Sequence, residues 1–311
     1  MEIASLEAAT AFKGKQLPWS ETLIIPIGDI QIQENRKLVD LEGLKSVIDY
    51  GVKHNAFFIG MGDFVDMESP SSRSALKFSG VYDSVVDAID AKAQELEDEL
   101  KKILEPTIGK WLGLVQGHHY HEYQDGTTSD TRFANYLKTK FLGDVGIVHL
   151  PFKPKNSHHQ IPTIDIFVTH GSGGGAAPTS ALNKLVNFSK GFIADIYLTG
   201  HHHKLSALSL ARIKAVFPKG VYGVEGWLEE EPYYLASTGS FLKGYLQGSQ
   251  KDGRAQGAYP EKANMNPLAL GAIKIRLRPV VSKGSTKVHI SVEVCFNMCY
   301  SVSYDTSTFF F

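Results

Sequence analysis

The chain has 311 residues, 43% of them apolar and 11% aromatic, enough to fill the core of one large α/β domain. Its 32 basic and 33 acidic residues give a formal charge of −1, which excludes bulk electrostatic affinity for nucleic acid or an anionic membrane. With two cysteines, Cys295 and Cys299, and no signal peptide or apolar run of about 18 residues, the sequence predicts a cytoplasmic protein without a membrane partner.

The first half of the chain predicts buried strands that alternate with amphipathic helices. Apolar runs at residues 23–27 and 56–60 predict two strands, and apolar residues spaced by three or four between them predict a helix. A second helix is expected from Ser84, its N-cap, to Ile103, followed by a short strand at 111–115 and a helix at 133–141. Strand, helix and strand in close succession are typical of a right-handed βαβ crossover, so a parallel sheet is expected.

In the second half of the chain, the hydrophobic pattern changes from continuous apolar runs to an alternation of apolar and polar residues. Apolar runs at residues 164–169 and 193–198 predict two more buried strands. Further on, apolar and polar residues alternate, which predicts antiparallel strands with one wet face. The expected organisation is a single domain over residues 1–311, with a long polar loop at 243–267 and C-terminal antiparallel strands at 268–300.

Five of the strand-like runs end in residue types that bind metals. These are Asp29, Asp63, His118 with His119, His170, and His201 with His203. In an open α/β sheet, ligand sites form outside the carboxyl ends of the strands, so these side chains are expected to converge. Carboxylates together with imidazoles suit Mn²⁺, Fe, Zn²⁺ or Ni²⁺. Two such ions sharing a carboxylate can activate a water and hold the oxygens of a phosphoryl group.

The order of these motifs resembles a known family. The motifs are Asp-x-Gln at 29–31, Gly-Asp-x-x-Asp at 62–66, Gly-His-His at 117–119, His-Gly at 170–171 and Gly-His-x-His at 200–203. They resemble the calcineurin-like metallophosphoesterases, whose motifs are Asp-x-His, Gly-Asp-x-x-Asp, Gly-Asn-His-Asp/Glu, His and Gly-His-x-His. The resemblance covers residues 22–240 and implies an α/β (α+β) fold, the four-layer αββα sandwich with mixed parallel and antiparallel sheets.

The resemblance also implies a role for each motif residue. The implied metal ligands are Asp29, Gln31 and His203 at a first ion, Asp63 as the bridge, and His118, His170 and His201 at a second ion. His119 would be the catalytic acid that protonates the leaving oxygen or stabilises the phosphate oxygens. The Ser-rich stretch 67–80 carries Arg73, which reaches the strand ends if this stretch folds back over them.

Three departures from the family pattern bear on the site. Gln31 stands where the family has a histidine, and its amide oxygen is a poorer ligand for Zn²⁺ or Fe, so we expect Mn²⁺. His118 replaces an asparagine, which a metal ion accepts readily. Tyr120 replaces the acid expected to orient the catalytic histidine, and Asp66 or Glu122 would take over that contact.

The leading hypothesis is a metal-dependent phosphoesterase that hydrolyses P–O bonds with a water activated by two metal ions. A phosphodiester of nucleic acid or nucleotide is the preferred substrate, because Lys243, Lys251 and Arg254 with Tyr245 and Tyr259 offer phosphate contacts and stacking surfaces. A phosphomonoesterase for protein or small molecules is the alternative.

A non-catalytic metal-binding scaffold with a degenerate site is the competing class, with Gln31 and Tyr120 as its signs. Taking His119-x-His121 as the start of a metallo-β-lactamase motif leaves both Gly-Asp motifs unexplained. The three aromatic residues 309–311 favour a homodimer contact.

Overall fold

The structure is a computed structural model, and it describes residues 10–67, 82–154, 161–175, 177, 179–246, 250–251, 254–255, 259–281 and 288–296. Arg73 and the terminal residues 309–311, which carry two of the sequence expectations, lie outside these residues. No helix in the described part of the chain is long and apolar enough to cross a membrane.

The apolar runs of the first half form parallel strands separated by helices. β2 (Thr22–Ile27) is buried at every residue and pairs in parallel with β3 (Phe57–Gly60), which pairs in parallel with β4 (Trp111–Leu114). α1 (Leu41–Lys53) connects β2 to β3 and buries Leu44, Val47 and Ile48. The other elements of this half are β1 (Thr10–Lys13), η1 (Arg36–Leu38), α3 (Asp83–Leu104), η2 (Glu105–Thr107) and α4 (Ser129–Tyr136).

Two helices begin at other residues than the pattern predicts. α3 begins one residue before Ser84, and its cap, Tyr82, has extended backbone and makes no side-chain cap bond. The helix predicted at 133–141 begins at Ser129, because Thr128 and the third residue of the helix cap each other reciprocally, and it ends at Tyr136. Capping chemistry, rather than the apolar period, sets this second boundary.

The strands of the second half extend the sheet. β5 (Val145–Pro151) pairs antiparallel with β6 (Thr163–Thr169), and β6, β7 (Ile196–Thr199) and β9 (Trp227–Ser240) are mutually parallel. β7 starts three residues later than the run at 193–198 predicts. The remaining elements are α5 (Ser180–Gly191), β8 (Leu205–Val216), β10 (Gln250–Lys251), β11 (Arg254–Ala255), α6 (Tyr259–Lys262), β12 (Gly271–Val281) and β13 (Val288–Phe296).

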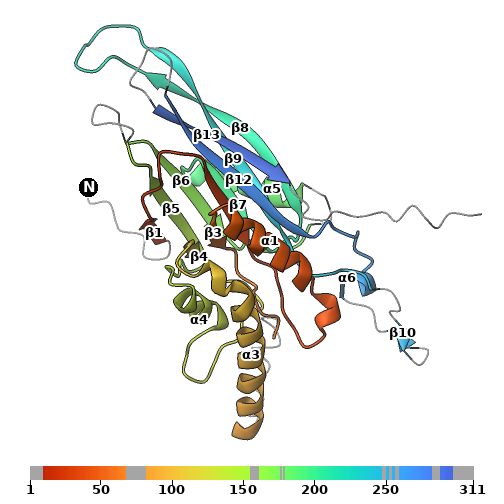
Figure 1. Cartoon of the computed structure of the whole chain (residues 1–311). Coiled ribbons are helices and arrows are strands. Elements are labelled where there is room, and N and C mark those ends of the chain that lie inside the picture. The colour runs from red at the N-terminus through yellow and green to blue at the C-terminus, as the bar shows by residue number, and fades with distance from the viewer. Residues whose placement is uncertain are drawn as a thin grey trace, which may run out of the picture.

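The fold is mixed α/β, with one 11-stranded sheet of parallel and antiparallel pairs. The strand order is β1-β5-β6-β7-β9-β12-β2-β3-β4, with β13 beside β12 and β8 beside β9. β9 and β12 pair only where Gly271 faces Ser240 and Ala272 faces Gly239, so the sheet nearly divides into two groups of strands there. The long strands β8, β9, β12 and β13 run together away from helices α3 and α4 (Figure 1).

Three apolar clusters hold these strands in place. Alternate residues of β2 enter different clusters: Ile25 packs with α1, α3 and α4, whereas Ile24 packs with residues of β6, β7 and β12. The third cluster joins Phe167, Tyr197 and Leu235 to α5. Burial of these side chains fixes the strands whose ends carry the candidate ligands.

Candidate metal centre

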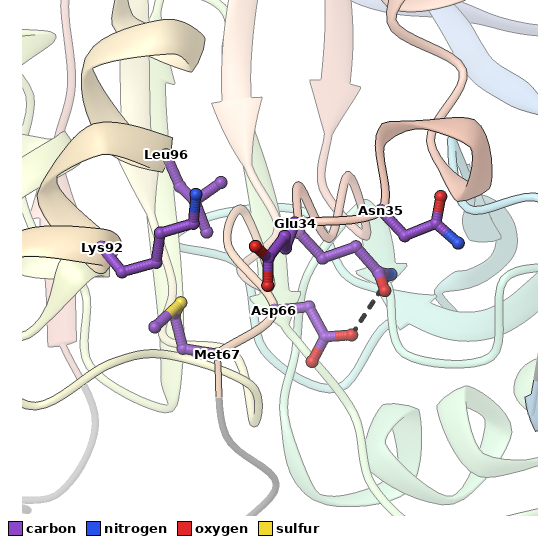
Figure 2. A pocket seen from close by; sticks show the side chains of 7 residues that line it. Glu34, Asn35, Asp66, Met67, Lys92 and Leu96 are labelled. Atoms are coloured by element: carbon purple, nitrogen blue, oxygen red, sulfur yellow. Dashed lines mark hydrogen bonds between the residues drawn. The ribbon is translucent and has the colours of Figure 1, made fainter. Parts of the chain in front are cut away.

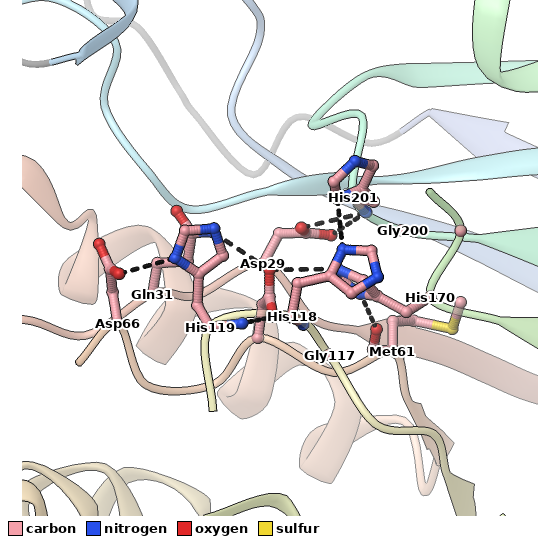
Figure 3. A network of polar contacts seen from close by, with 12 residues as sticks. Asp29, Gln31, Met61, Asp66, Gly117, His118, His119, His170, Gly200 and His201 are labelled. Carbon is pink, nitrogen blue, oxygen red and sulfur yellow. Dashed lines mark hydrogen bonds and ion pairs between the residues drawn. The ribbon is translucent and has the colours of Figure 1, made fainter. Parts of the chain in front are cut away.

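The candidate ligands lie at the ends of five strands that share one edge of the fold. Asp29 follows β2, and Asp63 follows β3. Backbone bonds join these two loops directly, because the Asp29 N–H donates to the Gly62 carbonyl at 3.0 Å and the Gln31 N–H donates to the Asp63 carbonyl at 2.9 Å. His118 follows β4, and His170 and the Gly-His-x-His motif follow the parallel strands β6 and β7. The structure therefore brings together all seven residues that the sequence proposes as ligands. Figure 3 shows five of them, Asp29, Gln31, His118, His170 and His201.

Five of these residues adopt a backbone conformation that side chains normally avoid. Among the described residues, eight non-glycine residues have positive φ. Five of the eight are Asp29 (47°), Gln31 (49°), Asp63 (53°), His201 (63°) and His203 (55°). Such a conformation costs about 1 kcal/mol or more per residue and persists where the surroundings impose it, most often at functional sites. Its concentration here points to function independently of residue type.

Three imidazoles converge at one end of the centre. The ring of His118 lies 4.8 Å from that of His170 and 4.7 Å from that of His201, centroid to centroid. The Nδ1 atoms of His118 and His201 are 3.2 Å apart. Burial, together with the positive charge of His170, lowers the pKa of His118 and lowers the pKa of His201 to about 4. Both rings are therefore neutral at physiological pH and present lone pairs.

Asp63 connects the three imidazoles to the rest of the centre. Its side chain is 1% exposed, and its Oδ1 accepts the backbone N–H groups of His118 and His119. Burial raises the pKa of Asp63, but the charge of His170 and the hydrogen bonds outweigh burial and hold this pKa well below its usual range. A carboxylate that stays charged in the interior suits a ligand shared between two cations.

His170 is oriented as a metal ligand. Its Nδ1 donates to the Met61 carbonyl at 2.6 Å, which leaves Nε2 directed into the centre, 3.1 Å from Oδ2 of Asp63. That contact lacks hydrogen-bond geometry, so Nε2 is buried without a hydrogen-bond partner. Burial lowers the pKa of His170, but Asp63 outweighs it and raises this pKa to about 10. The opposite charges of His170 and Asp63 attract each other across this contact, and a divalent cation in place of the His170 proton fits the same donor set.

The other end of the centre contains Asp29 and His203. The Nε2 of His203 lies 3.3 Å from Oδ1 of Asp29, and both oxygens of Asp29 accept the His201 N–H. Gln31 lies beside them, but its Nε2 donates to Oδ2 of Asp63 at 3.2 Å. Coordination through the amide oxygen therefore requires the Gln31 amide to flip, and this ligand is the weakest of the seven.

His119 lies outside the ligand set and is held by a carboxylate. Its Nδ1 is 2.8 Å from Oδ1 of Asp66, and Oδ2 of Asp66 accepts Nε2 of Gln33 at 3.4 Å. The hydrogen bond to Asp66 raises the pKa of His119 above its ordinary value, against the effect of burial. Asp66, one of the two acids that the sequence proposes for this contact, therefore orients His119.

Other residues that the sequence proposes as substrate contacts lie elsewhere or are outside the described side chains. Lys243 forms an ion pair of 3.8 Å with Asp40, and the hydroxyl of Tyr245 donates to a backbone carbonyl. The side chains of Lys251, Arg254 and Tyr259 lie outside the described part of the chain.

Two residues outside the proposed ligand set also support the centre. The Ser240 hydroxyl donates to the Asp29 carbonyl at 2.9 Å and lies 3.2 Å from Nδ1 of His203. The fully buried Asp130, in the first turn of α4, accepts the Gly117 N–H at 2.8 Å and so fixes the loop before His118. The Gly239-Ser240 turn after the run at 233–238 is visible in the sequence, whereas no local pattern marks Asp130, which acts through a contact distant in sequence.

Gly117 is required because the Asp63 carboxylate occupies the space where a side chain would lie. A Cβ at this position would be 2.1 Å from both the backbone nitrogen and Oδ1 of Asp63. We expect Gly117→Ala to displace this carboxylate, to weaken Mn²⁺ binding at least about tenfold and to lower the free energy of unfolding by about 1–3 kcal/mol. Metal titration and chemical denaturation measure both. Gly174→Ala is the control, since a Cβ there meets nothing within 4 Å, and equal behaviour of the two variants would contradict this account.

Asp130 predicts a pH dependence of stability. Burial raises the pKa of its carboxyl to about 7, although the bond from the Gly117 N–H opposes this. The folded chain therefore keeps a proton that the unfolded chain loses above its ordinary pKa, so stability falls as pH rises from about 4 to about 7, by at most about 4 kcal/mol. We expect Asp130→Asn, which keeps an acceptor for Gly117 but cannot ionise, to abolish this part of the decline. Urea unfolding of the metal-free wild type and of Asp130→Asn at about pH 5 and pH 8 tests it. An equal decrease in the free energy of unfolding of the two proteins between these pH values would refute it.

Comparisons with known proteins add only distant likenesses. No protein-family model matches the sequence, and no curated protein matches it. Vacuolar protein sorting 29 from Entamoeba histolytica, solved with zinc, is 12% identical, with a TM-score of 0.38 over 88% of this chain and 98% of that one. A predicted phosphoesterase from Streptococcus pneumoniae is 13% identical, with a TM-score of 0.32 over 89% and 99% of the two chains. GAP50 of Plasmodium, an anchor in the inner membrane complex, is 10% identical, with a TM-score of 0.41 over 83% and 82%. Assignment of a function therefore depends on the geometry of the centre.

Proposed function

We propose that this chain is a metal-dependent phosphoesterase that hydrolyses P–O bonds, with phosphodiesters of nucleotides or nucleic acid as its preferred substrates. One observation carries the proposal: two groups of ligand atoms share His170, each group lying within 4.8 Å, and His119 with its orienting Asp66 stands beside them. A structural metal site needs only the ligands. The adjacent acid, held by a carboxylate and outside the ligand set, is what a hydrolytic site adds.

The donor set fits two divalent ions. Three imidazoles with the Asp63 carboxylate would hold one ion, and Asp29, His203 and the same carboxylate, with Gln31 after its amide flips, would hold the other. We propose Mn²⁺ as the natural metal because carboxylate and amide oxygens suit it, with Fe, Zn²⁺ and Ni²⁺ as competitors. When bound, such ions lower the pKa of water and neutralise phosphoryl oxygens.

The residues of the chain supply orientation and the proton. Asp66 fixes the His119 ring through Nδ1, so Nε2 is the nitrogen that delivers a proton to the leaving oxygen. The hydrogen bonds from the His118 and His119 N–H groups fix the Asp63 carboxylate and join the acid to the metal ligands. Because Oδ1 of Asp63 accepts both N–H groups, the same carboxylate that would bind the metals also fixes the position of the acid.

The proposed fold is a four-layer αββα sandwich. Successive side chains of β2 support this proposal, because they point to opposite faces of the sheet and enter two different apolar clusters. One cluster is shared with helices and the other with the opposite group of strands, and a third cluster packs against α5. The phosphodiester preference rests on the sequence of the loop at 243–267, in which Lys243 is paired with Asp40 and the side chains of Lys251 and Arg254 lie outside the described part of the chain.

Hydrolysis of two chromogenic substrates tests the proposal. We expect Mn²⁺-loaded protein to hydrolyse bis-p-nitrophenyl phosphate faster than p-nitrophenyl phosphate, and the reverse order would instead make it a phosphomonoesterase. If the protein hydrolysed neither substrate and bound less than about half an ion per chain after Mn²⁺ loading, a non-catalytic scaffold would be favoured. The flip that Gln31 requires is the observation that favours this alternative.

A further inference from the structure

The hairpin formed by β8 and β9 is an arm that extends from the body of the protein. The two strands pair along the whole of β8, as far as Val216 with Trp227. β9 has 14 residues and β12 has 11, and they diverge from the pairing of Ser240 with Gly271, so the arm projects beyond the end of β12 (Figure 1). We call residues 215–228, which include the connection between the two strands, the arm tip.

Apolar side chains surround the arm tip. Successive side chains of a strand alternate between its faces, so the facing pair Val216 and Trp227 lies on one side of the ribbon. The next pair, Ala215 with Leu228, lies on the opposite side. Trp227 is 49% exposed and Leu228 is 73% exposed. The connection between the strands adds four further exposed apolar side chains: Phe217, Val221, Tyr222 and Val224.

The charges of the arm lie mainly behind its tip. Residues 212–214 pair with residues 229–231, a run of three glutamates, and Lys214 forms an ion pair of 3.0 Å with Glu231. We call these two segments the charged band. The tip itself carries two charges, which cancel: Lys219 and Glu225. The polarity of the arm therefore changes along its length, whereas that of an ordinary surface ribbon changes from one face to the other.

The arm tip also contains a hollow of about 310 Å³. Its walls are apolar apart from Glu225 and Gly226, and the other lining residues are Ala215, Phe217, Trp227 and Leu228. A second hollow, of about 520 Å³ beside Asp66, has polar and charged walls that include Glu34 and Lys92 (Figure 2). The walls of the tip hollow suit a hydrocarbon group instead.

This distribution suits a lipid interface better than a folded partner. A protein that docks on a ribbon covers one of its faces, whereas a bilayer surface surrounds an inserted tip on all sides. Tryptophan and tyrosine are enriched at the boundary between headgroups and hydrocarbon, and a lysine stem lets its ammonium reach the headgroups. Burial of the charged band would cost too much free energy, so the band limits insertion to the interface.

We propose that the arm tip binds the surface of a lipid bilayer and inserts its apolar side chains as far as the charged band. Residues 212–231 contain three basic and four acidic residues, so electrostatic attraction to anionic lipid does not drive this binding. Apolar burial drives it, and a formal charge of −1 for the whole chain does not oppose that. This partner departs from the sequence expectation of a protein without a membrane partner.

The arm would hold the candidate metal centre away from the bilayer. β8 begins two residues after His203 and has 12 residues, which at about 3.3 Å per residue place the tip about 40 Å from the centre. A chain bound upright by its tip would therefore act on substrates in solution rather than on headgroup phosphates. The proposal uses no residue of the metal centre and is independent of the proposed phosphoesterase function.

Flotation of the full chain with phosphatidylcholine vesicles tests the proposal. We expect the wild type to bind these uncharged vesicles, and added phosphatidylglycerol to bring no increase. The double variant Phe217→Ser with Tyr222→Ser should lower the partition coefficient at least about tenfold. Ile193→Ser is the control, because Ile193 is 82% exposed but lies outside the arm, and it should bind as the wild type does. No binding by the wild type, or equal binding by the double variant, would overturn the proposal.

Trp227 reports whether the tip itself enters the interface. Its fluorescence should shift to shorter wavelength with vesicles, and Trp227→Phe should remove the shift while it still binds. A shift of the same size in Trp227→Phe would contradict insertion of the tip. Sedimentation velocity identifies the competing occupant, a second copy of this chain. A wild type that binds no vesicles and forms a dimer, which the double variant dissociates, would overturn the membrane proposal and assign the tip to that dimer.

Discussion

Asp63→Asn is expected to abolish metal binding and hydrolysis together. Asparagine keeps an oxygen for the N–H groups of His118 and His119 but loses the charge that faces His170, and Asp63 is the only ligand proposed for both ions. We expect the affinity for Mn²⁺ to fall more than about 100-fold and the rate of bis-p-nitrophenyl phosphate hydrolysis to fall to the rate measured without protein. Elemental analysis of the loaded protein and a steady-state assay measure the two effects.

The matched control for this change is Asp165→Asn. Asp165 pairs with His149 between β5 and β6 at 2.7 Å, so it has the same chemistry away from the centre. Its variant should keep both metal and activity. Two ions retained by Asp63→Asn would show that Asp63 is not the shared ligand.

His119→Ala is expected to slow catalysis while sparing the metals. For an ester with an alkyl leaving group, such as adenylyl-adenosine, we expect kcat to fall by about 10²–10⁴, because no other proton reaches the leaving oxygen as readily. The loss should be smaller for bis-p-nitrophenyl phosphate, because nitrophenolate is stable without a proton. Asp66→Asn should give a smaller loss in the same direction, since it removes the orienting contact only.

The dependence on the leaving group distinguishes a proton donor from a group that stabilises phosphate oxygens. Equal losses on both esters would assign His119 to the phosphate oxygens instead. His149→Ala, a histidine that also pairs with a carboxylate, serves as the control. Undiminished turnover by His119→Ala would remove this residue from the mechanism.

The sequence predicts the strands of this fold better than their arrangement. Runs such as 23–27 are fully apolar because both faces of β2 are buried, and that signal is local. The position of β12 between β9 and β2 depends on pairing across more than half of the chain, and no local pattern encodes it. The start of α4 could be read from the sequence only in part. Thr128 and Thr131 form a capping box there, but the spacing of the apolar residues alone predicts a later start.

The candidate site is predictable to the extent that it follows from strand ends. Parallel strands deliver residues such as Asp29 and Asp63 to one edge, so residue type and position in sequence suffice to propose them. The choice of Asp66 over Glu122 depends on the direction of a loop, and the roles of Asp130 and Ser240 depend on contacts with distant backbone groups. Such contacts can be identified only from a three-dimensional structure.

Anomalous diffraction from crystals soaked in Mn²⁺ tests the central claim most directly. We expect two peaks, one among the nitrogens of His118, His170 and His201 and one beside Asp29 and His203, with Asp63 contacting both. Crystals that bind no ion among these side chains, at a Mn²⁺ concentration that saturates the protein in solution, would contradict the assignment of this edge of the sheet as a metal centre.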